Sequence, residues 1–125
     1  MSTTTALVLF AHGARDPRWS APFERLQLVT QAQLPDVAVR LAFLELMEPR
    51  LPEVAAELVQ AGCGKLTIVP VFLGQGGHVL RDLPQIVTQL QVDHPQVEIR
   101  VADAVGESAA VLDAMAQYCV ATVAN

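Results

Sequence analysis

The sequence predicts an α/β domain with a four-stranded parallel sheet, in the strand order 2-1-3-4, and helices on both faces of the sheet. Four short, nearly continuous apolar runs alternate with segments in which apolar residues recur at helical spacing. Apolar runs without polar alternation are typical of strands buried on both faces, as in parallel sheets. Strict alternation of strand and helix indicates βαβ units with right-handed crossovers. The order 2-1-3-4 is the smallest doubly wound arrangement, and its switch point lies between the first and third strands.

The expected strands are the four apolar runs themselves. They are Ala6–Ala11, Val37–Leu44, Leu66–Leu73 and Val97–Ala102. Pro70 lies within the third run and cannot donate a hydrogen bond to a neighbouring strand. We therefore expect a local irregularity at that point of the sheet.

The expected helices carry stripes of apolar residues. The stripes are Phe23, Leu26 and Val29; Leu51, Val54, Ala55 and Leu58; Leu83, Ile86, Val87 and Leu90; and Leu112, Met115, Ala116 and Cys119. Pro49 is placed to open the second helix and Gly62 to close it. Ser20 and Ser108 are the expected N-caps of the first and fourth helices.

Length and composition predict a single domain over residues 1–125. Apolar residues make up 52% of the chain and charged residues 17%, which excludes an intrinsically disordered protein. The 8 basic and 13 acidic residues give a net charge of −5, which argues against general binding to nucleic acid or to anionic membranes.

The sequence also favours a cytoplasmic protein. No apolar run reaches the roughly 18 to 20 residues of a membrane helix. The apolar stretch near the start lacks a preceding basic region, so we interpret it as a strand and not as a signal peptide. Cys63 and Cys119 stand alone, without CxxC pairing, which indicates reduced thiols and neither a disulfide framework nor a zinc ribbon.

Residues that could act as ligands or bases follow the strands at one edge of the predicted sheet. His12–Pro17 follows the first strand, Glu45 the second, Gly74–His78 the third and Asp103 the fourth. Parallel strands deliver these segments to the same edge, where ligands of open α/β sheets bind. His94 precedes the fourth strand and so falls on the opposite edge, where we expect a solvated turn residue.

His12 and His78 flank the predicted crevice, and Glu45 lies near them. Neutral imidazole is a common ligand of cobalt, iron, nickel and zinc, and it accepts protons near pH 7. A single histidine is more often structural than functional, but two histidines on one edge favour a functional site. With Glu45 they form a set that could hold a divalent metal, remove protons, or do both.

The glycine-rich loop at Gly74–Gly77 does not match the patterns of nucleotide-binding loops. We therefore expect no nucleotide cofactor. Gly76 and Gly77 would permit a flat or bulky ligand to approach the backbone closely, although the glycines can equally be required by the turn alone.

Three arginines flank the histidine segments and are candidate ligands for carboxylates. They are Arg15, Arg18 and Arg81. Loop arginines are equally often just solvated, and Trp19 can either pack under the first loop or face a ligand.

Three separated motifs resemble the short-form, CbiX-type sirohydrochlorin chelatases. The motifs are His12-Gly13-Ala14-Arg15-Asp16-Pro17; Phe43-Leu44-Glu45 followed by Pro49; and Pro70-Val71-Phe72-Leu73 with Gly77-His78 and Asp82-Leu83-Pro84. The resemblance extends over nearly the whole chain. The sequence departs from the family at Ala14, where a serine is usual, which removes one hydroxyl contact.

The resemblance implies insertion of a divalent metal, Co²⁺ or Fe²⁺ with Ni²⁺ as a further candidate, into sirohydrochlorin without ATP. The product would lead to cobalamin or siroheme. The family's metal-binding and catalytic histidines correspond to His12 and His78, and its acidic residue to Glu45. Larger relatives contain two such α/β halves that face one cleft, so we expect two copies of this chain to form a homodimer in place of the two halves. We expect neither nucleic acid nor a membrane as a partner.

Two other interpretations remain at this point. The chain could be a metal- or tetrapyrrole-binding module without turnover, which would bind both partners and insert nothing. The His-Gly-x-Arg-x-Pro pattern also occurs in histidine phosphatases, but Ala11 stands where that family has an arginine. A phosphatase assay with a generic ester separates that class of enzyme from a chelatase.

Overall fold

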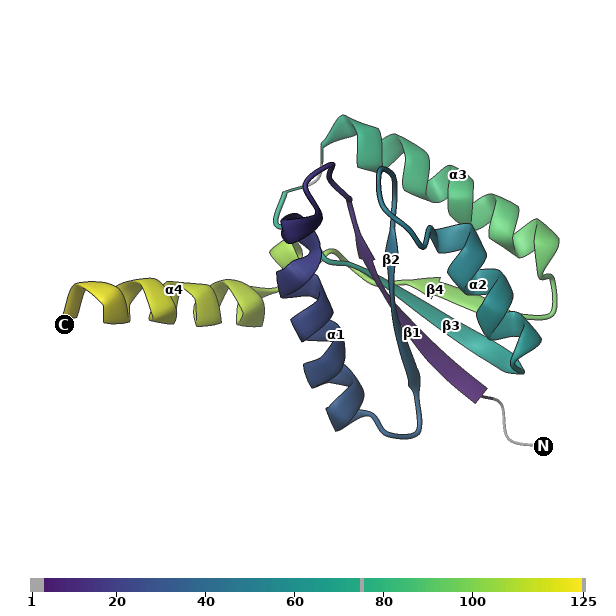
Figure 1. The fold of residues 1–125 in the computed structure, drawn as a ribbon, viewed down its shortest axis with the longest axis horizontal. Helices are drawn as coiled ribbons and strands as arrows, with labels where there is room; N and C mark the ends of the chain where they lie inside the picture. The colour runs from purple at the N-terminus through teal and green to yellow at the C-terminus, as the bar shows by residue number, and fades with distance from the viewer. Residues whose placement is uncertain (1–3, 75, 125) are drawn as a thin grey trace.

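The computed structural model describes residues 4–74 and 76–124, without the side chains of His78 and Leu80. Its centre is one four-stranded sheet in the order β2-β1-β3-β4, and all three strand pairs are parallel, as the sequence predicted (Figure 1). The strands are β1 (Thr4–Ala11), β2 (Ala38–Phe43), β3 (Cys63–Pro70) and β4 (Glu98–Val101).

The third strand differs most from its predicted bounds. It begins at Cys63 and ends at Pro70, whereas the apolar run suggested Leu66–Leu73. Pro70 is the last residue of the strand because the chain then turns away, and the next N–H, of Val71, donates to the carbonyl of Phe10 at 2.9 Å. The expected irregularity at Pro70 is therefore wrong; the register of the β1–β3 pair shifts between Thr4 and Thr5 instead.

One face of the sheet packs against α2 (Leu51–Gln60) and α3 (Gly77–Asp93). Their apolar stripes meet the inward side chains of the strands in a core that includes Phe10 and Ile68, both fully buried. α2 begins at Leu51 with Pro52 in its first turn, so Pro49 lies outside the helix it was predicted to open. Gly62 follows the end of α2 as predicted, with a φ of 102° that suits glycine.

The other face carries α1 (Ala21–Gln33), which follows the short 3₁₀ helix η1 (Pro17–Ser20). α1 packs mainly on β2, and Phe23 joins a second core cluster there. Trp19 packs on Phe23, with ring centroids 4.6 Å apart, which resolves the open question about its position in favour of packing. Ser20 occupies the N-cap position, but its side chain makes no capping hydrogen bond.

The fourth helix, α4 (Ala109–Ala124), does not cover the sheet. It follows a second short 3₁₀ helix, η2 (Val105–Glu107), and runs away from the rest of the molecule (Figure 1). Ser108 caps it as predicted, because its Oγ accepts a hydrogen bond from the N–H of Val111 at 3.3 Å. The predicted stripe from Leu112 to Cys119 is helical but buries nothing in this chain.

Candidate active site

The carboxyl edge of the sheet gathers the segments that the sequence singled out. His12 follows β1, Glu45 follows β2, and the loop after β3 leads through Gly76 into the first turn of α3. Asp103 follows β4 and is exposed. His94 caps the far end of α3 and precedes β4, so it lies at the opposite edge, as expected.

The loops after β1 and β2 are held together through their backbones. The N–H of Leu44 donates to the carbonyl of Ala11 at 2.9 Å, and the N–H of Glu45 donates to the carbonyl of His12 at 3.2 Å. Gly13 has a φ of 98°. A Cβ atom at this glycine would lie only 1.8 Å from the carbonyl oxygen of Glu45, so the close approach of the two loops requires glycine here.

His12 and Glu45 face one another across this junction. The Nε2 atom of His12 lies 3.9 Å from Oε2 of Glu45, and the two side chains are 40% and 32% exposed. Both are therefore accessible to a ligand while their backbones remain fixed.

The ring of His12 also has a defined orientation. Its Nδ1 lies 3.1 Å from the carbonyl oxygen of Gly13, which can only accept a hydrogen bond. Nδ1 must therefore carry a proton in this contact, and in the neutral imidazole Nε2 is then the lone-pair nitrogen, which is the atom that binds metals and accepts protons. The 3.9 Å gap between Nε2 and the carboxylate is within the span of two metal bonds of about 2.1 Å each.

The structure gives only the backbone position of the second predicted histidine. His78 lies in the first turn of α3, after β3, and therefore at the same edge as His12, but its side chain is outside the described part of the chain. Gly76 is the N-cap of α3, Gly77 is its first residue and both are exposed, while Gln75 is not among the described residues. Within the described residues no three His, Cys, Asp or Glu side chains form a metal-binding group.

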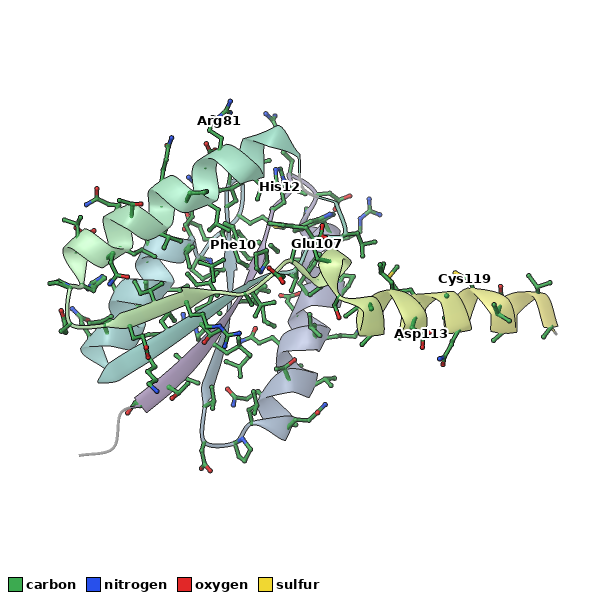
Figure 2. All side chains as sticks on the ribbon, turned by 180° about the vertical axis from the view of Figure 1, so that it is seen from behind. Phe10, His12, Arg81, Glu107, Asp113 and Cys119 are labelled. Carbon is green, nitrogen blue, oxygen red and sulfur yellow. The ribbon has the colours of Figure 1, made fainter. Side chains whose placement is uncertain are left out.

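The three predicted arginines differ in their surroundings. Arg15 is exposed. Arg18 forms a close ion pair with Asp16, with an Nη2–Oδ2 distance of 2.6 Å, and this guanidinium holds the pKa of the Asp16 carboxyl below its usual value. Arg81 lies on α3 and points outward above His12 in Figure 2; its Nε is 3.5 Å from Oδ1 of Asp82.

One contact at this edge was not anticipated from the sequence. The N–H of Gly106 in η2 donates to the carbonyl of Phe72 at 2.9 Å, and a Cβ atom at Gly106 would lie 1.8 Å from the carbonyl oxygen of Leu73. The segment before α4 is thus packed directly on the chain that leaves β3. A glycine six residues before a helical apolar stripe gave no sequence signal for this contact, because the partner backbone is more than thirty residues away in the sequence.

The chain matches the model of the CbiX family over residues 6–121. A sirohydrochlorin cobaltochelatase of Methanosarcina barkeri is 27% identical over 120 residues, which cover 90% of this chain and 92% of the relative. A second cobaltochelatase, from Methanococcus aeolicus, is 33% identical over 89 residues, or 70% of this chain and 62% of the relative. Four of the curated cobaltochelatases, including the one from Methanococcus aeolicus, are longer than the segment that this chain matches, which spans 57% to 62% of their length.

Solved structures share the fold. A CbiX protein from Marinobacter aquaeolei VT8 superposes with a TM-score of 0.85 at 29% identity and covers 95% of this chain and 97% of its own. The sirohydrochlorin chelatase SirB from Bacillus subtilis subspecies spizizenii, in complex with cobalt, gives a TM-score of 0.76 at 21% identity, with 85% of this chain and 45% of that chain covered.

Among the described residues, no helix is both long and apolar enough to cross a membrane.

Proposed function

The chain belongs to the CbiX family, and from this premise we propose that it is a chelatase that inserts Co²⁺ or Fe²⁺ into sirohydrochlorin without a nucleotide. Several relatives carry the name sirohydrochlorin cobaltochelatase, and one of them aligns over 90% of this chain. The metal ion is a substrate of this reaction, so the site must bind it and then release it into the macrocycle.

The observation that carries the proposal is the pairing of His12 with Glu45. A lone-pair nitrogen and a carboxylate oxygen face one another at 3.9 Å on an accessible edge of a parallel sheet. Nitrogen and oxygen ligands suit Co²⁺ and Fe²⁺, and an incomplete ligand set binds a metal more loosely than a closed thiolate cage.

The same two groups fit the proton chemistry of the reaction. The macrocycle loses two pyrrole N–H protons as a divalent metal enters its centre, so a base must be within reach. Imidazole has a suitable pKa, and Nε2 of His12 is the atom that accepts the proton. We assign Glu45 to assist this transfer, and His78, in the first turn of α3, to serve as the second metal-binding and catalytic histidine.

Substrate contacts are assigned to the arginines and glycines around this edge. Arg15 and Arg81 are exposed and suited to bind the carboxylates of the tetrapyrrole. Arg18 already pairs with Asp16, so a substrate carboxylate would have to replace that partner. Gly76 and Gly77 would allow the macrocycle to approach the backbone where α3 begins.

The wider biological setting belongs to the same proposal. Residues 1–125 act as one domain in the cytoplasm. The domain acts as a homodimer, because a single open edge does not enclose a flat macrocycle. The partners are sirohydrochlorin and the metal, and the product enters either cobalamin or siroheme synthesis. Parallel assays with Co²⁺, Fe²⁺ and Ni²⁺ would identify the metal that is inserted fastest.

The test is the initial rate of Co²⁺ insertion into sirohydrochlorin, followed by absorbance and corrected for the spontaneous rate. His12→Ala and His78→Ala should each lower the catalysed rate by about 10²- to 10⁴-fold, since each removes a base or ligand. His94→Ala, at the opposite edge, is the matched control and should retain the wild-type rate. Circular dichroism checks that every variant is folded.

Two results would contradict this assignment. If His12→Ala and His78→Ala both retain more than half of the wild-type rate, the site is elsewhere. If the wild-type chain binds Co²⁺ and sirohydrochlorin without accelerating insertion, it is a binding module and not a chelatase.

A further inference from the structure

Two leucines are exposed in the loops at the carboxyl edge of the sheet. Leu46 lies three residues beyond the end of β2, and Leu73 lies three residues beyond the end of β3. Leu46 is 49% exposed and Leu73 is 56% exposed. Single apolar residues on a protein surface are ordinary, so a function for these two has to be argued from their backbones, their packing and their position.

The backbone of Leu46 has a conformation that leucine rarely adopts. Its φ is 68°, and among the described residues other than glycine it is the only one with a positive φ. Asparagine, aspartate and glycine adopt this left-handed conformation at lower cost than leucine. Residues held in such conformations cluster at functional sites, and Leu46 directly follows Glu45. The local conformation therefore does not account for a leucine at this position.

Packing inside the chain does not account for it either. The neighbours Leu44 and Met47 each pack against one of the two core clusters, but Leu46 belongs to neither cluster. Leu73 is also outside both clusters, although Phe72, just before it, is part of the larger one. Folding would therefore be served as well by a polar side chain at position 46 or 73.

The backbone of Leu73 is held in place by η2. The N–H of Gly106 donates to the carbonyl of Phe72 at 2.9 Å, and a Cβ atom at Gly106 would lie 1.8 Å from the carbonyl oxygen of Leu73. This contact orders the chain that leaves β3 while Leu73 itself remains exposed. An exposed side chain on an ordered backbone loses little conformational entropy when a ligand covers it.

The strand order places the two leucines on either side of His12. β1 lies between β2 and β3 (Figure 1), and His12 is the first residue beyond β1. Neighbouring strands are about 4.8 Å apart, so the ends of β2 and β3 are roughly 10 Å apart with the end of β1 between them. The loops on both sides of His12 thus each carry one exposed leucine.

We propose that Leu46 and Leu73 contact the ring of the tetrapyrrole and hold it next to His12 and Glu45. The conjugated ring of a tetrapyrrole is flat and apolar, and the carboxylates of sirohydrochlorin lie around its rim. Such a ligand needs apolar contacts near the centre of its site as well as cationic groups around it. The inference rests on the proposed function and extends it, because the arginines and glycines assigned above supply no apolar side chain for the ring.

Leu46→Asn separates a contact with the substrate from a role in folding. Asparagine is similar in size and tolerates a positive φ better than leucine, but it offers no apolar surface. The midpoint of urea unfolding should therefore stay the same or rise. The dissociation constant for metal-free sirohydrochlorin, followed under nitrogen by the fluorescence anisotropy of the macrocycle, should rise about 4- to 12-fold, which corresponds to losing the burial of the exposed half of one leucine.

Two further variants and a second ligand complete the test. Leu73→Asn should weaken sirohydrochlorin binding by a similar factor, and the two factors should multiply in the double variant. Val92→Asn is the matched control, because Val92 is 68% exposed near the end of α3 at the opposite edge, and it should bind sirohydrochlorin as tightly as the wild type. Co²⁺ alone, titrated by calorimetry, should bind Leu46→Asn as it binds the wild type, since His12 and Glu45 are unchanged.

Three results would overturn the inference. They are unchanged binding of sirohydrochlorin in both leucine variants, a lowered urea midpoint in Leu46→Asn, which would show a role in folding, and a loss of Co²⁺ affinity in Leu46→Asn, which would show an effect through Glu45.

Failure of the proposed function has a different signature. A wild type that binds sirohydrochlorin more tightly than both leucine variants, but does not accelerate Co²⁺ insertion, would refute the chelatase and leave the contact with the ring standing. An active wild type whose affinity is unchanged in both variants would refute the contact alone, and a wild type that binds no sirohydrochlorin would refute both.

Discussion

Replacing Gly13 by alanine should destabilise the protein far more than the same change at Gly62. Both glycines have a φ near 100°, so both replacements carry the cost of a backbone conformation that alanine rarely adopts, about 1 to 3 kcal/mol. Nothing lies within 4 Å of a Cβ atom at Gly62, whereas a Cβ atom at Gly13 would be 1.8 Å from the carbonyl oxygen of Glu45. Gly62→Ala therefore measures the conformational cost alone.

The additional cost at Gly13 can be worked out from the contacts. The loops after β1 and β2 must separate by more than an ångström, an overpacking cost of about 1 to 3 kcal/mol. The hydrogen bond from Glu45 to His12 is then weakened, at a further cost of about 0.5 to 1.5 kcal/mol. Gly13→Ala should thus lose roughly 1.5 to 4.5 kcal/mol more than Gly62→Ala.

Urea unfolding followed by circular dichroism, at one fixed protein concentration, gives both free energies of unfolding. Because a domain of this kind has a total stability of about 5 to 15 kcal/mol, the difference is readily measured. Equal losses for the two variants would show that the loops separate without cost, and the argument that Gly13 fixes the spacing of His12 and Glu45 would fail.

Three further predictions concern single side chains. Glu45→Gln should insert Co²⁺ at a rate between those of the wild type and His12→Ala, because it removes a proton-accepting carboxylate but keeps the imidazole; a rate below that of His12→Ala would reverse the assigned roles. Burial raises the pKa of the Cys63 thiol, so at pH 7.5 Cys63 should react with Ellman's reagent only after the protein is unfolded in urea. The measurement uses Cys119→Ser, which leaves Cys63 as the remaining thiol, and fast reaction of the folded protein would contradict the prediction. In carbon-13 NMR spectra the Asp16 carboxyl should titrate below its ordinary pKa of about 3.9, and in Arg18→Ala its pKa should return towards that value. The stabilising effect of the pair is present above the ordinary pKa and is lost as the pH falls through the lowered pKa. An unshifted titration in the wild type would show that the pair does not persist in solution.

The sheet could be predicted from the sequence because its strands carry a local signal. Runs such as Ala6–Ala11 are short and apolar on both faces, and this pattern is typical of strands inside parallel sheets. The order 2-1-3-4 is the smallest doubly wound arrangement, and the edge that carries His12 and Glu45 follows from the parallel direction of the strands. His94 was assigned to the opposite edge by the same reasoning.

Other features depend on contacts between distant backbones and leave no local pattern. The end of β3 at Pro70 is decided by where the chain leaves the sheet, and the approach of Gly13 to Glu45 is decided by how two loops meet. The direction of α4 is the clearest case. Its stripe from Leu112 to Cys119 predicts a buried helix face, but these residues bury nothing in this chain, because the contact of Gly106 with the distant backbone of Phe72 and Leu73 fixes where α4 begins.

The placement of His12 and Glu45 directly after neighbouring strands also has a consequence for the entropy of the metal binding that we propose for them. Each residue is only one or two positions beyond the end of its strand, and a backbone hydrogen bond joins the two at 3.2 Å. Ordering a flexible residue costs about 1 to 2 kcal/mol for its backbone alone. In this protein that cost is met when the sheet folds, so under the proposed function an arriving metal ion would have only the side-chain torsions of His12 and Glu45 to restrict.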